Sequence, residues 1–307
     1  MKKTLIIVSL ALCPLLAGAQ TTAREYLDSY TRQVRNVGYS GVGVETILNK
    51  WEADFPDDGA MLEGRFNYYF AKSLTTKIEP VGGERYLGNP PAFSLPDSTG
   101  TKINYFEVHY YDEADFAEAQ KAVDRAISLY PDELMYRLDK ISALMDYEKD
   151  SPDLAAAELT ALVDYDKSSS PAWTYDGEPV DRENFLSVVQ QYCYNFYRTG
   201  TPNSYESFRA ISEKMNKLYP KNTEFLSNLG TYWFVAKGNN RKALSYYTKV
   251  LKLDPGNYAA VKNCVLMARR GKDVKMEKKY LPMLIQVTDS QTEKMAAQAR
   301  LQALGAK

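Results

Sequence analysis

The sequence predicts an all-α protein of about twelve helices in antiparallel pairs, interrupted by two loop insertions. The first observation is a helical spacing of apolar residues, for example Val44, Ile47, Leu48 and Trp51 at i, i+3, i+4 and i+7. The second is punctuation by proline, which ends one helix and is tolerated just before the next begins. Short turns of this kind join neighbouring helices in an antiparallel arrangement. The punctuating prolines are Pro56, Pro131, Pro220 and Pro255.

Residues 1–19 have the composition of a secretory signal peptide. Two lysines precede an apolar run, Leu5–Leu12, and Ala17-Gly18-Ala19 supplies an A-x-A cleavage site. A transmembrane anchor is disfavoured because the run is shorter than the ~20 apolar residues that span a bilayer. A lipoprotein signal is disfavoured because the large Leu12 precedes Cys13, where a small residue is required. We therefore expect cleavage between Ala19 and Gln20, and export of the mature chain.

The charge balance argues against a nucleic-acid-binding protein. The sequence holds 38 basic and 39 acidic residues, and loss of Lys2 and Lys3 with the signal peptide leaves a formal charge of −3. A nucleic-acid-binding domain would show a basic excess instead. No later segment is apolar enough to cross a bilayer, so no transmembrane segment is expected in the mature chain.

Capping signals mark the ends of the predicted helices. Thr22-Ala23-Arg24-Glu25 is a capping box that opens a helix ending near Gly38. Asp181 is a predicted N-cap for a helix that stops at Thr199-Gly200, and Thr201-Pro202 opens the next helix. Ser290–Glu293 is a second capping box, which opens the last helix. Other predicted helices carry apolar faces, which include Met61 and Leu62, Phe116 to Leu129, Leu134 to Leu144, Leu154 to Leu162, Phe208 to Leu218, Val261 to Ala268, and Leu281 to Val287.

Two stretches interrupt the helical pattern. The first, at about 77–111, concentrates Gly and Pro between Lys77 and Lys102, and long connections of this kind are usually functional or disordered. Its last part, Ile103–Tyr111, has β-propensity and is expected either to pair as a short strand or to lie extended in a groove. The second, at about 168–180, is a turn-rich loop that contains Trp173 and Tyr175. We expect specificity to reside in these insertions.

The stretch Leu226–Asn257 carries two sets of helix-packing residues, which are Leu226, Leu229, Gly230 and Trp233 on a first helix, and Ala243, Tyr247, Val250 and Leu253 on a second. With these residues the stretch resembles a tetratricopeptide repeat (TPR), a 34-residue helix–turn–helix unit whose copies stack into a solenoid. The forward count from Pro220 and the backward count from Pro255 differ by one residue, which predicts one inserted residue between Phe234 and Ala243.

This resemblance implies a right-handed TPR-like solenoid. Residues 20–307 are then expected to form a single helical-repeat domain, with its best repeat at 223–257. The last helix, 290–307, carries polar residues among alanines, which suits the solvent-facing cap that ends a solenoid.

Residue types that carry catalysis or bind metals are sparse. His109 is the sole histidine, and a zinc site needs three or four ligands. Neither phosphate-binding glycine motif occurs, and the acidic clusters lack the alternation of a calcium loop. We predict a non-enzymatic protein with no cofactor and no metal. Cys193 and Cys264 are predicted to be buried free thiols, because they fall on helices too far apart for a disulfide.

Position counts along the resemblance select candidate ligand-binding residues. In the repeat family, the first helix of each unit lines the concave surface of the solenoid. Counting from Pro56 places Glu63, Asn67 and Phe70 on that surface. Counting from Pro220 adds Thr231 and Phe234, although the backward count makes Phe234 a packing residue. Rigid aromatic rings beside Asn and Glu suit an extended peptide or a glycan.

The resemblance implies an interaction protein. We expect an exported scaffold, periplasmic in a Gram-negative bacterium or secreted, whose concave TPR surface binds a protein or peptide partner or assembles an envelope complex. The alternative is a carbohydrate-binding protein of a surface glycan-uptake system, against which the short length and Leu12 count. A third interpretation, a hydrolase with its site in the first insertion, would require convergent acids there.

Overall fold

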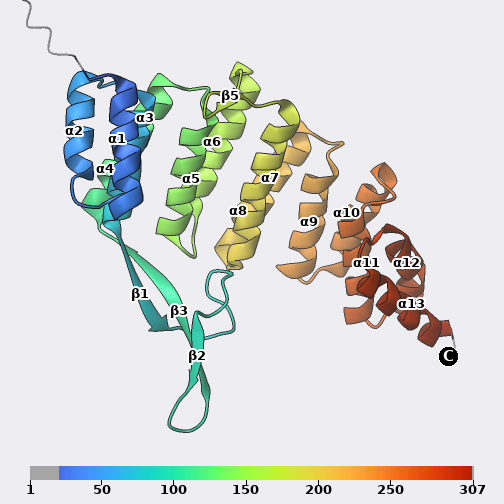
Figure 1. Cartoon of the computed structure of the whole chain (residues 1–307). Coiled ribbons are helices and arrows are strands. Elements are labelled where there is room, and N and C mark those ends of the chain that lie inside the picture. Colours follow the sequence, from blue (N-terminus) through green and yellow to red (C-terminus); the bar gives the residue numbers. More distant parts are fainter. Residues whose placement is uncertain (1–20, 306–307) are drawn as a thin grey trace, which may run out of the picture.

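The structure is a computed structural model that describes residues 21–305, and it confirms the predicted all-α repeat fold. The described residues form thirteen helices that stand side by side in a curved row (Figure 1). The predicted signal peptide lies outside the described residues. The helices are α1 (Ala23–Val37), α2 (Val44–Asp54), α3 (Gly59–Ser73), α4 (Glu113–Leu129), α5 (Leu134–Glu148), α6 (Asp153–Ser169), α7 (Arg182–Thr199), α8 (Pro202–Leu218), α9 (Thr223–Val235), α10 (Asn240–Leu253), α11 (Tyr258–Arg270), α12 (Val274–Val287) and α13 (Gln291–Gly305).

From α1 to α12 the odd-numbered helices form one layer and the even-numbered helices form the other. In the odd layer, the side-chain amides of Gln190 on α7 and Asn228 on α9 exchange hydrogen bonds of 3.1 and 2.8 Å. In the even layer, Lys214 on α8 forms an ion pair with Asp164 on α6. We call the side of α1, α3, α5, α7 and α9 that points away from the even layer the odd-helix face. It corresponds to the surface that the TPR resemblance predicts to be concave.

Most predicted helix starts are confirmed. The Thr22 side chain accepts a hydrogen bond from the Glu25 amide, and the Glu25 carboxylate accepts one from the Thr22 amide, which completes the capping box. Asp181 and Thr201 are also N-caps. In the second predicted capping box, only one of the two reciprocal hydrogen bonds forms. Ser290 accepts from the Glu293 amide, but the Glu293 carboxylate instead accepts hydrogen bonds from the hydroxyls of Thr288 and Tyr258.

The predicted insertion between Phe234 and Ala243 falls at a turn. Four residues, 236–239, join α9 to α10, four residues, 149–152, join α5 to α6, and three residues, 271–273, join α11 to α12. The turn between α9 and α10 closes with Gly238 in a left-handed conformation (φ 61°). The helix faces therefore keep their register, and Gly230 on α9 packs directly against the Tyr247 ring on α10.

Replacing Gly230 with alanine is expected to destabilise this pair of helices. A Cβ at Gly230 would lie 2.7 Å from a ring carbon of Tyr247, whose side chain is fully buried. Overpacking costs about 2–3 kcal/mol, and the better helix propensity of alanine offsets about 1 kcal/mol. A net loss of about 1.5 kcal/mol should appear in urea unfolding. In a Tyr247→Leu background the same change should cost nothing, and an equal loss there would refute the steric explanation.

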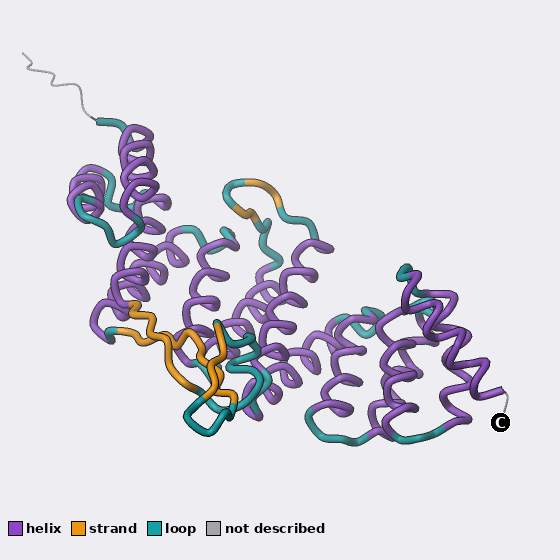
Figure 2. Tube along the Cα trace, turned by 60° about the horizontal axis from the view of Figure 1, so that its bottom comes forward, coloured by secondary structure: helices purple, strands orange, loops and turns teal. Residues whose placement is uncertain are grey.

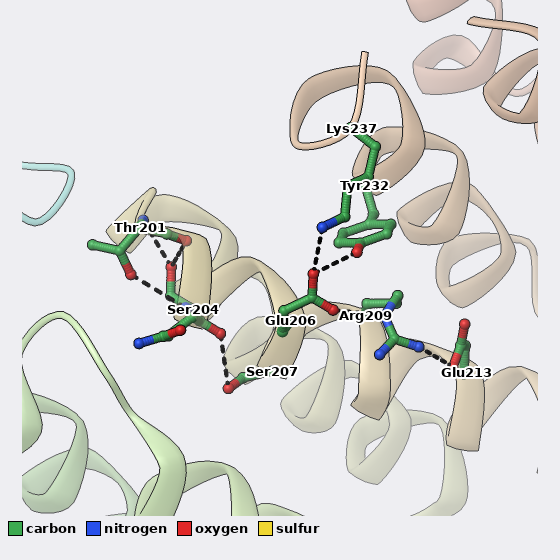
Figure 3. A network of polar contacts seen from close by, with 9 residues as sticks. Thr201, Ser204, Glu206, Ser207, Arg209, Glu213, Tyr232 and Lys237 are labelled. Atoms are coloured by element: carbon green, nitrogen blue, oxygen red, sulfur yellow. Dashed lines mark hydrogen bonds and ion pairs between the residues drawn. The ribbon is translucent and has the colours of Figure 1, made fainter. Parts of the chain in front are cut away.

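The core consists of two clusters that meet at α9. Phe225 and Tyr232 belong to the N-terminal cluster, and Leu226 and Phe234 belong to the C-terminal one. A polar network links α8 to the end of α9. The Glu206 carboxylate accepts a hydrogen bond from the Tyr232 hydroxyl at 2.6 Å and forms an ion pair with the Lys237 ammonium at 2.8 Å (Figure 3). Hydrogen bonds from Lys237 and Tyr232 lower the pKa of Glu206 to about 2. The two clusters thus share α9, and the network fixes this helix to α8.

The first insertion is a three-stranded antiparallel sheet, so the expectation of a structureless loop there was wrong. Strands β1 (Leu74–Pro80), β3 (Lys102–Tyr111) and β2 (Phe93–Pro96) lie in that order, and β1 begins directly after α3. Figure 2 shows the strands in orange. β-Branched residues in β1 pair with the aromatic β3, which favours strands over a loop. Of the two alternatives for Ile103–Tyr111, pairing as a strand is confirmed.

The second insertion carries a tight hairpin. Strands β4 (Thr174–Tyr175) and β5 (Glu178–Pro179) are joined by Asp176 and Gly177, both with positive φ, as a two-residue hairpin turn requires. Cys193 and Cys264 are buried free thiols, which confirms that prediction. No helix within residues 21–305 is long and apolar enough to cross a membrane.

Candidate binding surface

The odd-helix face brings two carboxylates together between α3 and α5. Glu63 and Asn67 lie one turn apart on α3, and Asp139 lies on α5. The Tyr136 side chain of α5 reaches across to α3, where a Cβ at Gly59 would lie 2.5 Å from its hydroxyl. Glu63, Asn67 and Asp139 are each half-buried. They form the centre of the candidate site.

The β4–β5 hairpin lies beside these carboxylates and is fixed at both ends. At its start, the Trp173 indole donates to Asp166 on α6 at 3.0 Å, and its ring stacks on Phe185 of α7. At its tip, the Glu133 carboxylate accepts hydrogen bonds from the Asp176 and Gly177 amides at 2.9 and 3.2 Å. This anchoring leaves the Tyr175 ring about half exposed (47%) next to the site.

Burial makes both carboxylates weak acids. Burial, followed by the charges of Asp139 and Asp176, raises the pKa of Glu63 to about 7. Burial raises the pKa of Asp139 to about 6. Burial, followed by the charges of Asp139 and Glu63, also raises the pKa of Tyr175. The charge of Asp139 thus acts on both Glu63 and Tyr175, which places the three side chains near one another.

The nearby basic residues of α5 do not neutralise this environment. The Arg137 guanidinium lies 4.5 Å above the Tyr165 ring, and the Lys140 ammonium pairs with Asp124 on α4 and Glu158 on α6. Both therefore point toward the even layer. Within residues 21–305 neither Glu63 nor Asp139 has an ion-pair partner. At pH 8 the site thus presents uncompensated negative charge.

Aromatic rings surround the carboxylates. Tyr30 on α1, Tyr136 on α5 and Tyr192 on α7 are all more than nine-tenths buried along the odd layer. The Tyr192 hydroxyl donates to the Leu138 carbonyl at 2.9 Å, which fixes that ring. These three rings belong to the core behind the carboxylates, and the exposed Tyr175 ring is the aromatic face that an ammonium or guanidinium group can contact.

The other predicted site residues lie apart from this centre. Phe70, at the end of α3, stacks against Tyr111 of β3 and Phe66. Thr231 lies on α9, three odd-numbered helices further along, where its hydroxyl is 3.0 Å from that of Tyr247. Phe234 is 6% exposed and packs in the C-terminal cluster, as the backward count predicted. A contribution of these three residues to ligand binding stays a prediction.

Asp139, Tyr175 and Asp176 were not selected by the sequence analysis. Glu63 was selected from the sequence because it lies seven residues after Pro56. The same count from Pro131 selects Leu138, which is buried. Asp139 is the next residue, so a tolerance of one position would have found it. Tyr175 and Asp176 lie in the second insertion, where specificity was expected, but no repeat count applies to a loop.

A pocket of about 320 Å³ lies between the first insertion and the end of α5. Asp146 closes it, accepting hydrogen bonds from His109 Nδ1 at 2.9 Å and from the Tyr111 hydroxyl. Opposite, the loop before β2 approaches α7 so closely that a Cβ at Gly88 would meet the Arg198 carbonyl oxygen. The insertion is therefore anchored to the solenoid at two points. Across residues 21–305, no three metal-ligating side chains converge there or elsewhere.

Comparisons with known proteins add two distant similarities. No family model matches the sequence, and no curated protein matches it. Among solved structures, the chain is similar to PilF of Pseudomonas aeruginosa, with 15% identity over 62% of this chain and 77% of that chain and a TM-score of 0.40. It is also similar to the flexible tandem repeat domain of a bacterial cellulose synthase component, with 17% identity over 94% and 98% of the two chains and a TM-score of 0.28.

Both TM-scores are below 0.5, so the class of the protein rests on its own architecture. The antiparallel helix pairs, the two layers and the repeat at α9–α10 define a TPR-like helical-repeat protein. Proteins of this architecture present extended surfaces rather than enclosed reaction sites.

Proposed function

We propose that this protein is a non-enzymatic interaction scaffold whose odd-helix face binds a positively charged segment of a polypeptide. The observation that carries the proposal is the pair Glu63 and Asp139, which lie together without a cationic partner in the described chain. A lysine or arginine side chain would supply the missing charge and contact the exposed Tyr175 ring. The signal-peptide composition of residues 1–19 further supports a partner outside the cytoplasm.

A peptide titration tests this proposal. The mature chain, starting at Gln20, is titrated at pH 8 with a capped peptide of alternating lysine and alanine, and with its glutamate counterpart. We expect binding of the lysine peptide alone. Replacing Glu63→Gln together with Asp139→Asn should weaken that binding by about tenfold, because both attractive charges are lost.

The matched control is Glu213→Gln, which removes an exposed carboxylate of α8 that is paired with Arg209. It should leave the affinity for the lysine peptide unchanged. Equal affinity of the double variant and the wild type would refute a site at Glu63 and Asp139. Retention on an immobilised glycan with no binding of either peptide would favour the carbohydrate-binding alternative.

A further inference from the structure

The outer edge of β1 carries unpaired backbone groups. The antiparallel pairing of β1 with β3 is bounded by two hydrogen bonds, from the Val81 amide to the Asn104 carbonyl and from the Asp112 amide to the Ser73 carbonyl. Inward-bonding residues alternate along an antiparallel strand. Odd-numbered residues of β1 therefore bond to β3, and the N–H and C=O groups of Thr76 and Ile78 point away from the sheet.

These groups have no hydrogen-bond partner within residues 21–305. Thr76 and Ile78 are exposed, and Figure 1 shows β1 as an outer strand of a sheet that projects beyond the helix ends. Strand edges in native proteins are commonly covered, or blocked by charged side chains and proline. Here Pro80 blocks only the end of the strand. Lys77 does not cover the edge, because its ammonium lies 4.9 Å above the Tyr110 ring on β3.

One face of the same sheet exposes several apolar side chains, together with Glu107, which lies opposite Ile78. Ile78, Phe93 and Leu95 are 46%, 45% and 52% exposed. The strand register places all three side chains on one face, together with Tyr105, whose ring stacks on Phe93. Exposed apolar side chains gathered in this way mark an interaction site. The face reaches the β1 edge at Ile78.

We propose that β1 binds an extended polypeptide segment, which adds to the sheet as a fourth strand. Only an extended backbone presents N–H and C=O groups at the spacing that satisfies Thr76 and Ile78 together. The segment alternates apolar and polar side chains, so that its apolar side chains lie beside Ile78 on the exposed face. This surface is separate from the odd-helix face, and its occupant needs no positive charge.

Amide hydrogen exchange measures directly whether the backbone amides at the β1 edge are hydrogen-bonded. In the free protein the Thr76 and Ile78 amides should exchange rapidly, whereas those of Thr75, Lys77 and Glu79 should be protected by β3. The ligand to add is a capped nonapeptide that alternates valine with threonine and carries glutamate at both ends. It should slow exchange at Thr76 and Ile78 by about tenfold or more.

Two variants of Thr76 isolate the contribution of its backbone N–H to peptide binding. Thr76→Pro removes the outward N–H while leaving the inward bonds of its neighbours, and should abolish peptide binding. Thr76→Val keeps the N–H and should bind as the wild type does. Persistent protection of Lys77 in Thr76→Pro would show that the sheet is still formed.

Three outcomes would overturn the proposal: protected Thr76 and Ile78 amides in the free protein, unchanged exchange with saturating peptide, or protection that depends on protein concentration. The last would identify a second copy of this chain as the occupant. The double variant Glu63→Gln, Asp139→Asn should bind the nonapeptide normally, so failure at either surface is distinguishable from failure at the other.

Discussion

Replacing Asp166 with alanine is expected to lower the free energy of unfolding by about 3 kcal/mol. The carboxylate is 4% exposed near the end of α6. It accepts hydrogen bonds from the Arg182 guanidinium at 2.6 and 2.7 Å and from the Trp173 indole at 3.0 Å. Alanine would leave the buried indole N–H without a partner, and an unsatisfied buried donor is more costly than a lost surface contact. Urea unfolding followed by circular dichroism measures the loss.

Asp164→Ala is the matched control for this prediction. Asp164 lies on the same helix but is exposed, and its ion pair with Lys214 is expected to contribute at most about 1 kcal/mol. Because Trp173 anchors the start of the β4–β5 hairpin, Asp166→Ala should also loosen the hairpin at that end and weaken lysine-peptide binding, while Glu133 still holds its tip. A loss of stability no greater than that of the control would show that Asp166 does not anchor the hairpin.

Raising the pH from about 5 to about 8 is expected to strengthen lysine-peptide binding and to weaken folding. The pKa of Glu63 is about 7 in the folded chain and 4.5 in an unperturbed carboxyl group. The folded state therefore binds the proton more tightly, so the free energy of unfolding falls as the pH rises through this interval. Asp139, with a pKa of about 6, acts in the same direction. The lysine side chains of the ligand stay charged throughout.

Glu63→Gln separates this linkage from other pH effects. At pH 8 the variant should be more stable than the wild type by on the order of 2 kcal/mol, because it no longer carries a half-buried charge. Near pH 5, where Glu63 is protonated in the folded chain, the two proteins should have similar stability. Thermal unfolding at both pH values measures the difference. Identical pH dependence of the variant and the wild type would mean that Glu63 is not the titrating group.

Stability and binding are thus expected to oppose each other at this site. A carboxylate that burial destabilises is retained at a cost in folding free energy, as is common for residues that serve function. Tyr30, Tyr136 and Tyr175 face Glu63 from α1, α5 and the hairpin, and none of them carries a positive charge to relieve that cost.

Features that depend on near neighbours along the chain were predicted well. Thr22 and Glu25 form their capping box because both partners lie within one turn. Ser290 and Glu293 have the same spacing, but Glu293 is drawn to Tyr258, which is distant in sequence and close in the fold. Residues 103–111 could form a strand only with a partner strand beside them. That partner is β1, part of which lies in a stretch that local propensity predicted to be a loop.

The sequence by itself determined the helix pairs, the repeat at α9–α10 and the separation of Cys193 from Cys264. Periodicity, caps and proline act within a few residues, so a linear pattern contains them. Only the tertiary structure decided that Asp139 faces Glu63 and that β1 has an open edge. The rotation of α5 against α3 follows from side-chain packing across the layer, and an edge is open only if nothing folds over it. Neither property is recorded in the spacing of residues along the chain.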